Sequence, residues 1–216
     1  YFVGFLMDGS LLLEKQKETN NYQIQSLPIN SGVFCLKKDR FQDVVWIGTD
    51  GQGVYLYSNP LYSIKSMVLS NYTEKIERPV RAIYLDDERT FWVGTKGNGI
   101  LKIYDYEFDK NISDCRAEVL TTSNSALSSN AVYCFAKSHR NLLWIGDEEG
   151  LTYYSYREKR IKSIPIRIGN EDFKYIHDIY ETADAELWLA SVGMGVVKAR
   201  IAGTPDNPVI VDAQRY

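Results

Sequence analysis

The sequence predicts an all-β fold, a β-propeller segment built from four-stranded antiparallel blades. The first observation is a short motif that recurs about every 45 residues: an apolar residue, Trp, an aliphatic residue, Gly or Ala, and a polar residue. The chain's four tryptophans all occupy its second position: Trp46, Trp92, Trp144 and Trp188. The second observation is that short runs rich in β-branched and aromatic residues surround each Trp, separated by turns of Gly, Asn, Asp and Ser. No segment carries a long helical stripe, which disfavours helical repeats.

Each unit has the same internal order, which the copy around Trp46 illustrates. An apolar run at residues 33–36 and a polar turn precede the Trp strand. A Gly-rich turn at 50–53 then leads into a third run at 54–57, and a weaker run at 63–68 ends the unit. Four short strands in about 45 residues are typical of a propeller blade, whose apolar faces become buried only when blades stack. We therefore expect the four tryptophans to wedge between blades at equivalent buried positions.

The repeat divides the chain into one incomplete and four complete blades. The predicted boundaries are a partial blade at 1–29 and blades at about 30–76, 77–126, 127–172 and 173–216. The first unit begins at Phe2, in the place of Trp, so its innermost strand is missing. The final run at 208–212 can serve as the last unit's outer strand or as that missing inner strand, but not as both. We therefore expect an arc of blades that leaves apolar faces open at both ends.

Composition excludes several classes of function. The 216 residues contain 25 Lys+Arg and 28 Asp+Glu, a net charge of −3, which argues against a nucleic-acid partner. No apolar run is long enough for a transmembrane helix, so this segment is not expected to insert into a membrane. The three cysteines, Cys35, Cys115 and Cys134, fit neither a disulfide framework nor a zinc site, and the first and last lie in apolar runs as buried thiols. No metal or cofactor is expected.

Two copies of the motif carry a longer signature. Residues 46–53 read Trp-Ile-Gly-Thr-Asp-Gly-Gln-Gly and residues 92–99 read Trp-Val-Gly-Thr-Lys-Gly-Asn-Gly, preceded by Asp39 and Asp86. This pattern resembles the two-component regulator propeller repeat, which is typical of the extracytoplasmic sensor region of hybrid two-component histidine kinases that control polysaccharide-utilisation genes. The resemblance implies a seven-bladed ring, a periplasmic location and a downstream kinase. It also implies remaining blades and downstream domains as partners, and a homodimer of the full-length protein.

The later copies depart from this pattern. Residues 147–150 read Asp-Glu-Glu-Gly where the repeat has Thr-x-Gly-x-Gly, and Ala190 stands in place of Gly. Ser138 and Thr182 occupy the position of Asp86. These departures are expected to loosen single blades without changing the fold.

Signatures of catalysis are missing from the sequence. There is no nucleophile elbow, zinc-protease helix, phosphate loop or dinucleotide fingerprint. Carboxylates gather at 86–88, at 147–149 and around Glu181, but in turns of different blades, where charge is ordinarily solvated. The preferred prediction is a non-catalytic sensor module that detects an oligosaccharide or relays its detection. The alternatives are a propeller enzyme, a lyase or glycoside-active protein with residues along the channel, and a scaffold for protein partners.

Two sets of residues are candidates for ligand binding. Aligning the first runs of the units places one aromatic or cationic residue at the same register in each: Phe34, Arg81, Tyr133 and His177. Aromatic faces and hydrogen-bonding groups are what a sugar ring needs. The alternative is that the aromatic residues belong to the core and that Arg81 pairs with a turn carboxylate. A second set lies on the Gly-rich turns: Gln52, Lys96 and Asn98.

Overall fold

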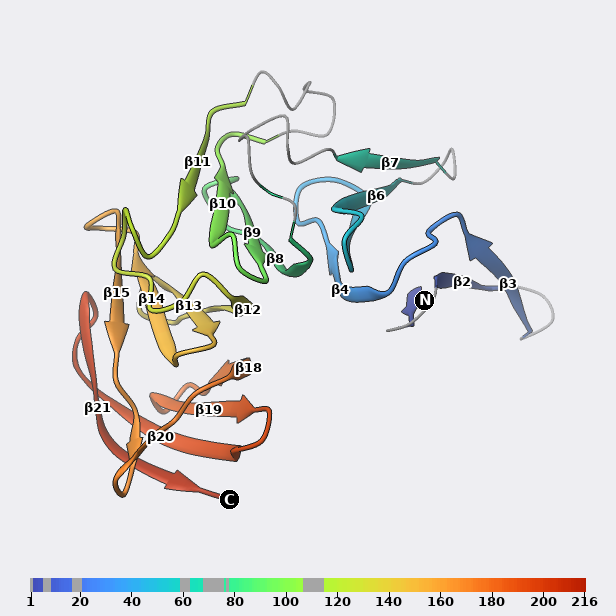
Figure 1. Cartoon of the computed structure of the whole chain (residues 1–216). Coiled ribbons are helices and arrows are strands. Elements are labelled where there is room, and N and C mark those ends of the chain that lie inside the picture. The colour runs from blue at the N-terminus through green and yellow to red at the C-terminus, as the bar shows by residue number, and fades with distance from the viewer. Residues whose placement is uncertain are drawn as a thin grey trace.

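The computed structural model describes residues 2–5, 9–16, 21–58, 63–67, 76, 78–106 and 115–216. Every regular element in these ranges is a β-strand (Figure 1). The strands form four four-stranded antiparallel sheets, one three-stranded sheet and one short hairpin. The expected all-β class and four-stranded sheets are therefore confirmed.

Each four-stranded sheet is a simple meander in which strands consecutive in sequence lie side by side. The second sheet contains β4 (Val33–Lys38), β5 (Val44–Thr49), β6 (Val54–Ser58) and β7 (Ser63–Met67). The third contains β8 (Val80–Leu85), β9 (Phe91–Thr95), β10 (Ile100–Ile103) and β11 (Ala117–Leu120). The fourth contains β12 (Val132–Lys137), β13 (Leu142–Asp147), β14 (Leu151–Ser155) and β15 (Arg160–Ile164). The fifth contains β18 (Ile176–Glu181), β19 (Glu186–Ser191), β20 (Gly195–Thr204) and β21 (Asn207–Arg215).

The first sheet has three strands, β1 (Phe2–Gly4), β2 (Ser10–Lys15) and β3 (Tyr22–Leu27). Strand β21 pairs with β20, with Ile201 opposite Ile210. The final run of the sequence therefore serves as the outer strand of the last sheet, and among the described strands none pairs with the free edge of β1.

The sheets follow one another around an arc (Figure 1). Strands β4, β8, β12 and β18 lie on its inner side, and each contacts the next one along the arc. The first and last sheets do not meet, so the described strands form an open arc; the number of blades in a complete ring stays a prediction.

Three of the four tryptophans wedge between sheets as expected. Trp46, Trp92 and Trp144 are fully buried. Trp46 stacks on Phe91 of the next sheet, with ring centroids 4.0 Å apart. Their burial therefore depends on the sheet that follows.

The prediction of an equivalent buried position is wrong for Trp188, which is only half-buried. Its aromatic neighbour is Tyr216, the residue after β21, at 5.5 Å between ring centroids. The physical reason is that no further sheet of the described chain covers this face of the fifth sheet.

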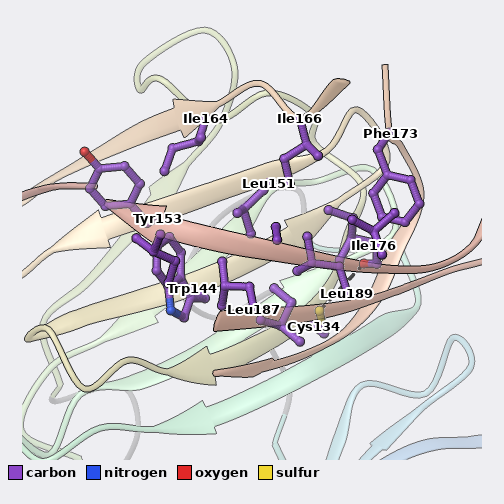
Figure 2. Packing of buried hydrophobic residues seen from close by; sticks show 14 of the residues in the cluster. Cys134, Trp144, Leu151, Tyr153, Ile164, Ile166, Phe173, Ile176, Leu187 and Leu189 are labelled. Atoms are coloured by element: carbon purple, nitrogen blue, oxygen red, sulfur yellow. Dashed lines mark hydrogen bonds between the residues drawn. The ribbon is translucent and has the colours of Figure 1, made fainter. Parts of the chain in front are cut away.

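The core shown in close-up lies between the fourth and fifth sheets (Figure 2). Trp144 and Leu151 of the fourth sheet pack with Ile176, Leu187 and Leu189 of the fifth (Figure 2). The β-sheets meet through apolar side chains on both partners, as stacked blades require.

The sequence analysis missed one element, the hairpin of β16 (Arg167–Ile168) and β17 (Glu171–Asp172). Gly169, with φ of 62°, begins its turn and is followed by Asn170. A Gly-Asn pair between short strands is a recognised hairpin signal, so the sequence did contain the information.

Candidate functional site

The inner strands share a local irregularity that defines the candidate site. In β4, Val33 pairs with Thr49 and Cys35 pairs with Gly48, so Phe34 between them is the extra residue of a β-bulge. The same register shift occurs in the other three inner strands, and the residues in question are Arg81, Tyr133 and His177. Bulges bend a strand and re-aim a side chain, and they are frequent next to functional sites. We call these four residues the inner ladder.

The side chains of the inner ladder contact one another in two pairs. The guanidinium carbon of Arg81 lies 3.9 Å from the centre of the Phe34 ring, in cation–π contact. Tyr133 and His177 stack with ring centroids 4.2 Å apart and an interplanar angle of 19°. The register alignment of the sequence therefore corresponds to real neighbours in space, on strands that adjoin around the inner side of the arc.

Electrostatic effects connect the two pairs. Burial lowers the pKa of His177 below its usual 6.5, and the positive charge of Arg81 lowers it further. Burial raises the pKa of Tyr133, Glu148 adds to this effect, and Arg81 opposes it. At neutral pH the His177 imidazole is therefore uncharged, and Arg81 is the cation of the inner ladder.

The alternative pairing of Arg81 with a turn carboxylate is absent from the described residues. The Nε atom of Arg81 is buried and has no hydrogen-bond partner. The turn carboxylates serve the tryptophans instead, because Asp39 accepts a hydrogen bond from the Trp46 indole at 2.9 Å and Asp86 accepts one from Trp92 at 2.9 Å.

The Gly-rich turns lie at the same end of the sheets as the inner ladder, because Thr49, the last residue of β5, pairs with the first residue of β4. Asn98 accepts a hydrogen bond from the backbone N–H of Arg78 at 3.1 Å, which fixes the entry to the third sheet. The Tyr55 hydroxyl donates to Gln52 at 2.9 Å. Lys96 is exposed.

A polar cluster that sequence reasoning missed lies between the third and fourth sheets. Lys102 is buried, and its Nζ lies within 5 Å of the ring centres of Trp92, Tyr104 and Tyr154. It donates a hydrogen bond to the Tyr154 hydroxyl at 2.9 Å, and burial lowers its pKa while Glu118 opposes this. A Lys inside the apolar run 100–103 was the available signal. Trp92, Tyr104, Tyr154 and Glu118 of the same chain surround the Lys102 ammonium, so this cluster has a structural explanation.

A cavity of about 540 Å³ lies beside this cluster. It is lined on one side by Glu118 and Leu120 of β11 and on the other by Tyr154, Arg160 and Lys162. None of the inner-ladder residues lines this cavity, so it is a separate feature on the outer part of the arc.

The carboxylate clusters have structural partners. Asp147 accepts hydrogen bonds from the hydroxyl of Thr152, at 2.8 Å, and from the backbone N–H groups of Glu149 and Gly150. Glu181 accepts one from Trp144 at 2.7 Å. Within the described ranges no group of three or more His, Cys, Asp or Glu residues is placed to hold a metal ion. No helix in the same ranges has the length and hydropathy to cross a bilayer.

Two of the cysteines also have equivalent positions. Cys35 and Cys134 lie on β4 and β12 beside Gly48 and Gly146 of the Trp strands. None of the three cysteines forms a disulfide. Burial raises the pKa of Cys35 to about 12, so this thiol is protonated and unreactive at neutral pH.

Two known proteins resemble the chain in sequence. No protein-family model matches the chain. Histidine kinase P4 from Formosa agariphila is 24% identical over 196 residues, which is 85% of this chain and 13% of that kinase. Translation initiation factor 6 from Saccharolobus solfataricus is 31% identical over 140 residues, 59% of this chain and 57% of that factor.

Solved structures match over nearly the whole chain. The extracellular domain of BT3049, assigned to a hybrid two-component system of B. thetaiotaomicron, superimposes with a TM-score of 0.69 at 23% identity, over 99% of this chain and 26% of that one. PorZ, a surface component of the type-IX secretion system of Porphyromonas gingivalis, superimposes with a TM-score of 0.67 at 14% identity, over 99% of this chain and 32% of that one. The Cps50 (Swd1) β-propeller domain of Myceliophteria thermophila superimposes with a TM-score of 0.60 at 12% identity, over 100% of this chain and 72% of that one.

These matches define the class: the chain has the β-propeller fold. The chain spans only 13% of the histidine kinase and about a quarter of the BT3049 domain. Because propellers with different functions share this fold, the activity of the whole protein has to be argued from the site.

Proposed function

We propose that this chain is part of the periplasmic sensor region of a hybrid two-component regulator, and that it binds an oligosaccharide without cleaving it. The repeat signature at residues 46–53 and 92–99 supports this assignment. The similarity to the BT3049 extracellular domain over 99% of the chain, and to histidine kinase P4 over 85%, points in the same direction.

The inner ladder is the observation that carries ligand binding. The stacked rings of Tyr133 and His177 provide aromatic surface, and Arg81, whose charge acts on both residues, provides hydrogen-bond donors. A pyranose ring has one face of C–H groups and a rim of hydroxyls, so this combination suits a sugar. The buried carboxylates Asp86, Asp147 and Glu181 are engaged in structural hydrogen bonds, which disfavours the enzyme alternative.

The proposal includes the partners expected from the sequence. Further blades and downstream domains of the same protein would cover the open faces of the arc and complete a seven-bladed ring. The full-length protein would act as a homodimeric histidine kinase, with this segment on the periplasmic side of the inner membrane.

Calorimetric titration of the intact protein with a panel of plant and host oligosaccharides tests the proposal. We expect one class of oligosaccharide to bind and to be recovered uncleaved by chromatography after incubation. Tyr133→Ala and His177→Ala should each weaken binding about tenfold or more, because an aromatic stacking platform is lost. Tyr180→Ala is the matched control, since Tyr180 is an exposed aromatic residue on the same strand as His177 but outside the inner ladder.

Cleavage of a bound sugar would contradict the non-catalytic part of the proposal. Binding that survives both inner-ladder substitutions, or a failure of every oligosaccharide in the panel to bind, would contradict the proposed site.

A further inference from the structure

Arg81 forms no ion pair or hydrogen bond with any described residue. Its guanidinium lies on the Phe34 ring at 3.9 Å, and its Nε atom is buried without a hydrogen-bond partner. The two terminal nitrogens, Nη1 and Nη2, are not among the buried unpartnered atoms, and within the described ranges they form no hydrogen bond. The outer edge of the guanidinium is therefore open on the inner side of the arc.

This arrangement is unusual because a buried polar atom of a charged side chain, such as this Nε, is ordinarily hydrogen-bonded. The cation–π contact holds the guanidinium against the Phe34 ring and leaves its N–H groups unpaired. Because Phe34 limits the movement of the guanidinium, its two terminal N–H groups can act as a fork. Such a fork matches two oxygens of a carboxylate or sulfate group.

The carboxylates of the neighbouring elements are engaged elsewhere. Asp86, in the turn after β8, accepts hydrogen bonds from Trp92 and from the backbone of Thr90. Glu148 accepts a hydrogen bond from Ser129, and Asp178 accepts one from the backbone of Ile179. Lys96, exposed on the Gly-rich turn of the same sheet as Arg81, adds a second positive charge at this end.

We propose that the inner ladder selects an anionic saccharide, whose carboxylate or sulfate group binds end-on to Nη1 and Nη2 of Arg81 while a sugar ring stacks against Tyr133 and His177. This inference rests on the proposed function, in which the inner ladder is the saccharide site. Uronic acids and sulfate esters share the chemistry that Arg81 recognises, so both are included in the test.

The test is calorimetric titration of the intact protein with three probes. The probes are tetragalacturonic acid, its carboxyl-reduced neutral counterpart, and a sulfated galactose tetrasaccharide. We expect at least one acidic probe to bind about tenfold or more tightly than the neutral one, with affinity that falls as salt is added. The acidic probe that binds identifies whether carboxylate or sulfate is the natural group.

Three variants locate the interaction. Arg81→Met removes the charge and keeps an apolar chain against Phe34, and should abolish the preference for the acidic probe. Arg81→Lys keeps the charge without the fork and should lose about tenfold or more of the affinity. Arg116→Gln is the matched control, because Arg116 also stacks on an aromatic ring, Tyr104, at 4.8 Å, but beside the outer strand of the same sheet. Thermal melts establish that each variant folds.

The outcomes separate the two proposals. If the neutral probe binds as tightly as the acidic ones and Arg81→Met changes nothing while His177→Ala weakens binding, the anionic selectivity is overturned and the saccharide site stands. If no probe binds, or if no inner-ladder variant affects binding, both are overturned.

Discussion

The carboxylate of Glu181, on the inner strand of the fifth sheet, accepts a hydrogen bond from the indole nitrogen of Trp144 in the fourth sheet, at 2.7 Å. In the second and third sheets the corresponding acceptor belongs to the same sheet as the Trp: Asp39 for Trp46 and Asp86 for Trp92. Ser138 occupies the equivalent turn position in the fourth sheet, where its hydroxyl accepts a hydrogen bond from the backbone N–H of Arg140. The acceptor for the Trp144 indole is supplied instead by Glu181 of the neighbouring sheet.

The first prediction concerns this exchange of acceptors. Glu181→Leu should destabilise the protein by about 1–3 kcal/mol, because it leaves the buried indole N–H of Trp144 without an acceptor. Glu181→Gln, which keeps an acceptor oxygen, should cost less. Urea denaturation of the intact protein measures both.

A double-mutant cycle gives the sharper test. Ser138→Asp should destabilise the parent protein by placing a second carboxylate near Glu181, but it should stabilise the Glu181→Leu variant by restoring the acceptor that Asp86 provides in the third sheet. Equal effects in both backgrounds would show that Glu181 does not replace the missing Asp. Glu186→Gln is the control, since Glu186 pairs with the half-exposed Lys198 and should contribute at most about 1 kcal/mol.

The second prediction concerns the glycine that lies two residues after Trp in the second, third and fourth sheets. A Cβ on Gly48 would lie 2.5 Å from the Cys35 sulfur, and a Cβ on Gly146 would lie 2.6 Å from the backbone oxygen of Ile176 in the next sheet. Gly146→Ala should therefore destabilise the protein by about 1–3 kcal/mol, because a neighbouring inner strand must shift.

The two glycines should respond differently to a second substitution. Cys35→Ala should largely rescue Gly48→Ala, since it removes the side chain in closest contact. Cys134→Ala should rescue Gly146→Ala poorly, because the carbonyl of Ile176 remains. Ala190→Gly at the equivalent position of the fifth sheet should cost only about 0.5–1 kcal/mol. Chemical denaturation measures each, and equal rescue at the two sites would contradict the packing argument.

The third prediction is a titration within the inner ladder. The pKa of His177 should lie below 6.5, and Arg81→Gln should move it back toward that value because Arg81 is the second cause of the shift after burial. NMR of the imidazole Cε1–Hε1 signals measures this, with only two histidines in the chain to assign. An unchanged pKa in the variant would show that the two residues do not interact.

The sign of the linked stability follows from the direction of this shift. A depressed pKa means that the unfolded chain binds the proton more tightly than the folded protein does. His177 therefore contributes stability that is fully present above pH 6.5 and is lost as the pH falls through the folded-state pKa. His177→Gln should flatten the pH dependence of unfolding in that window.

The repeat made the fold and the inner ladder predictable, because equivalent residues in successive sheets occupy equivalent places. Phe34, Arg81, Tyr133 and His177 could be aligned by register alone, although the bulges that re-aim them could not be seen. What the repeat could not predict are contacts specific to one pair of sheets. The hydrogen bond between Glu181 and Trp144 is one, and the burial of Lys102 against Tyr154 of the next sheet is another. Both contacts join residues of adjacent sheets that lie far apart in sequence.

The last prediction concerns the open face of the fifth sheet, defined by Tyr180, Trp188, Val196 and Lys198. Tyr180 and Lys198 lie opposite Trp188 on the adjoining strands, so they belong to the same face. Tyr180 is 66% exposed and Val196 is 37% exposed, whereas the opposite face of the sheet, with Leu187, Leu189 and Val197, is buried against the fourth sheet. In the second, third and fourth sheets the face that carries the Trp is covered by the following sheet. In the fifth sheet the same face is open.

In the isolated 216-residue chain, acrylamide should quench one of the four tryptophans readily, and Trp188→Phe should remove that accessible component. In the full-length protein the same component should be protected if further blades cover this face. Exposed apolar patches of this kind drive association, so light scattering should show the isolated chain associating, and Tyr180→Lys should reduce the association. A monomeric isolated chain with a cooperative melt and four protected tryptophans would show instead that the arc closes on itself.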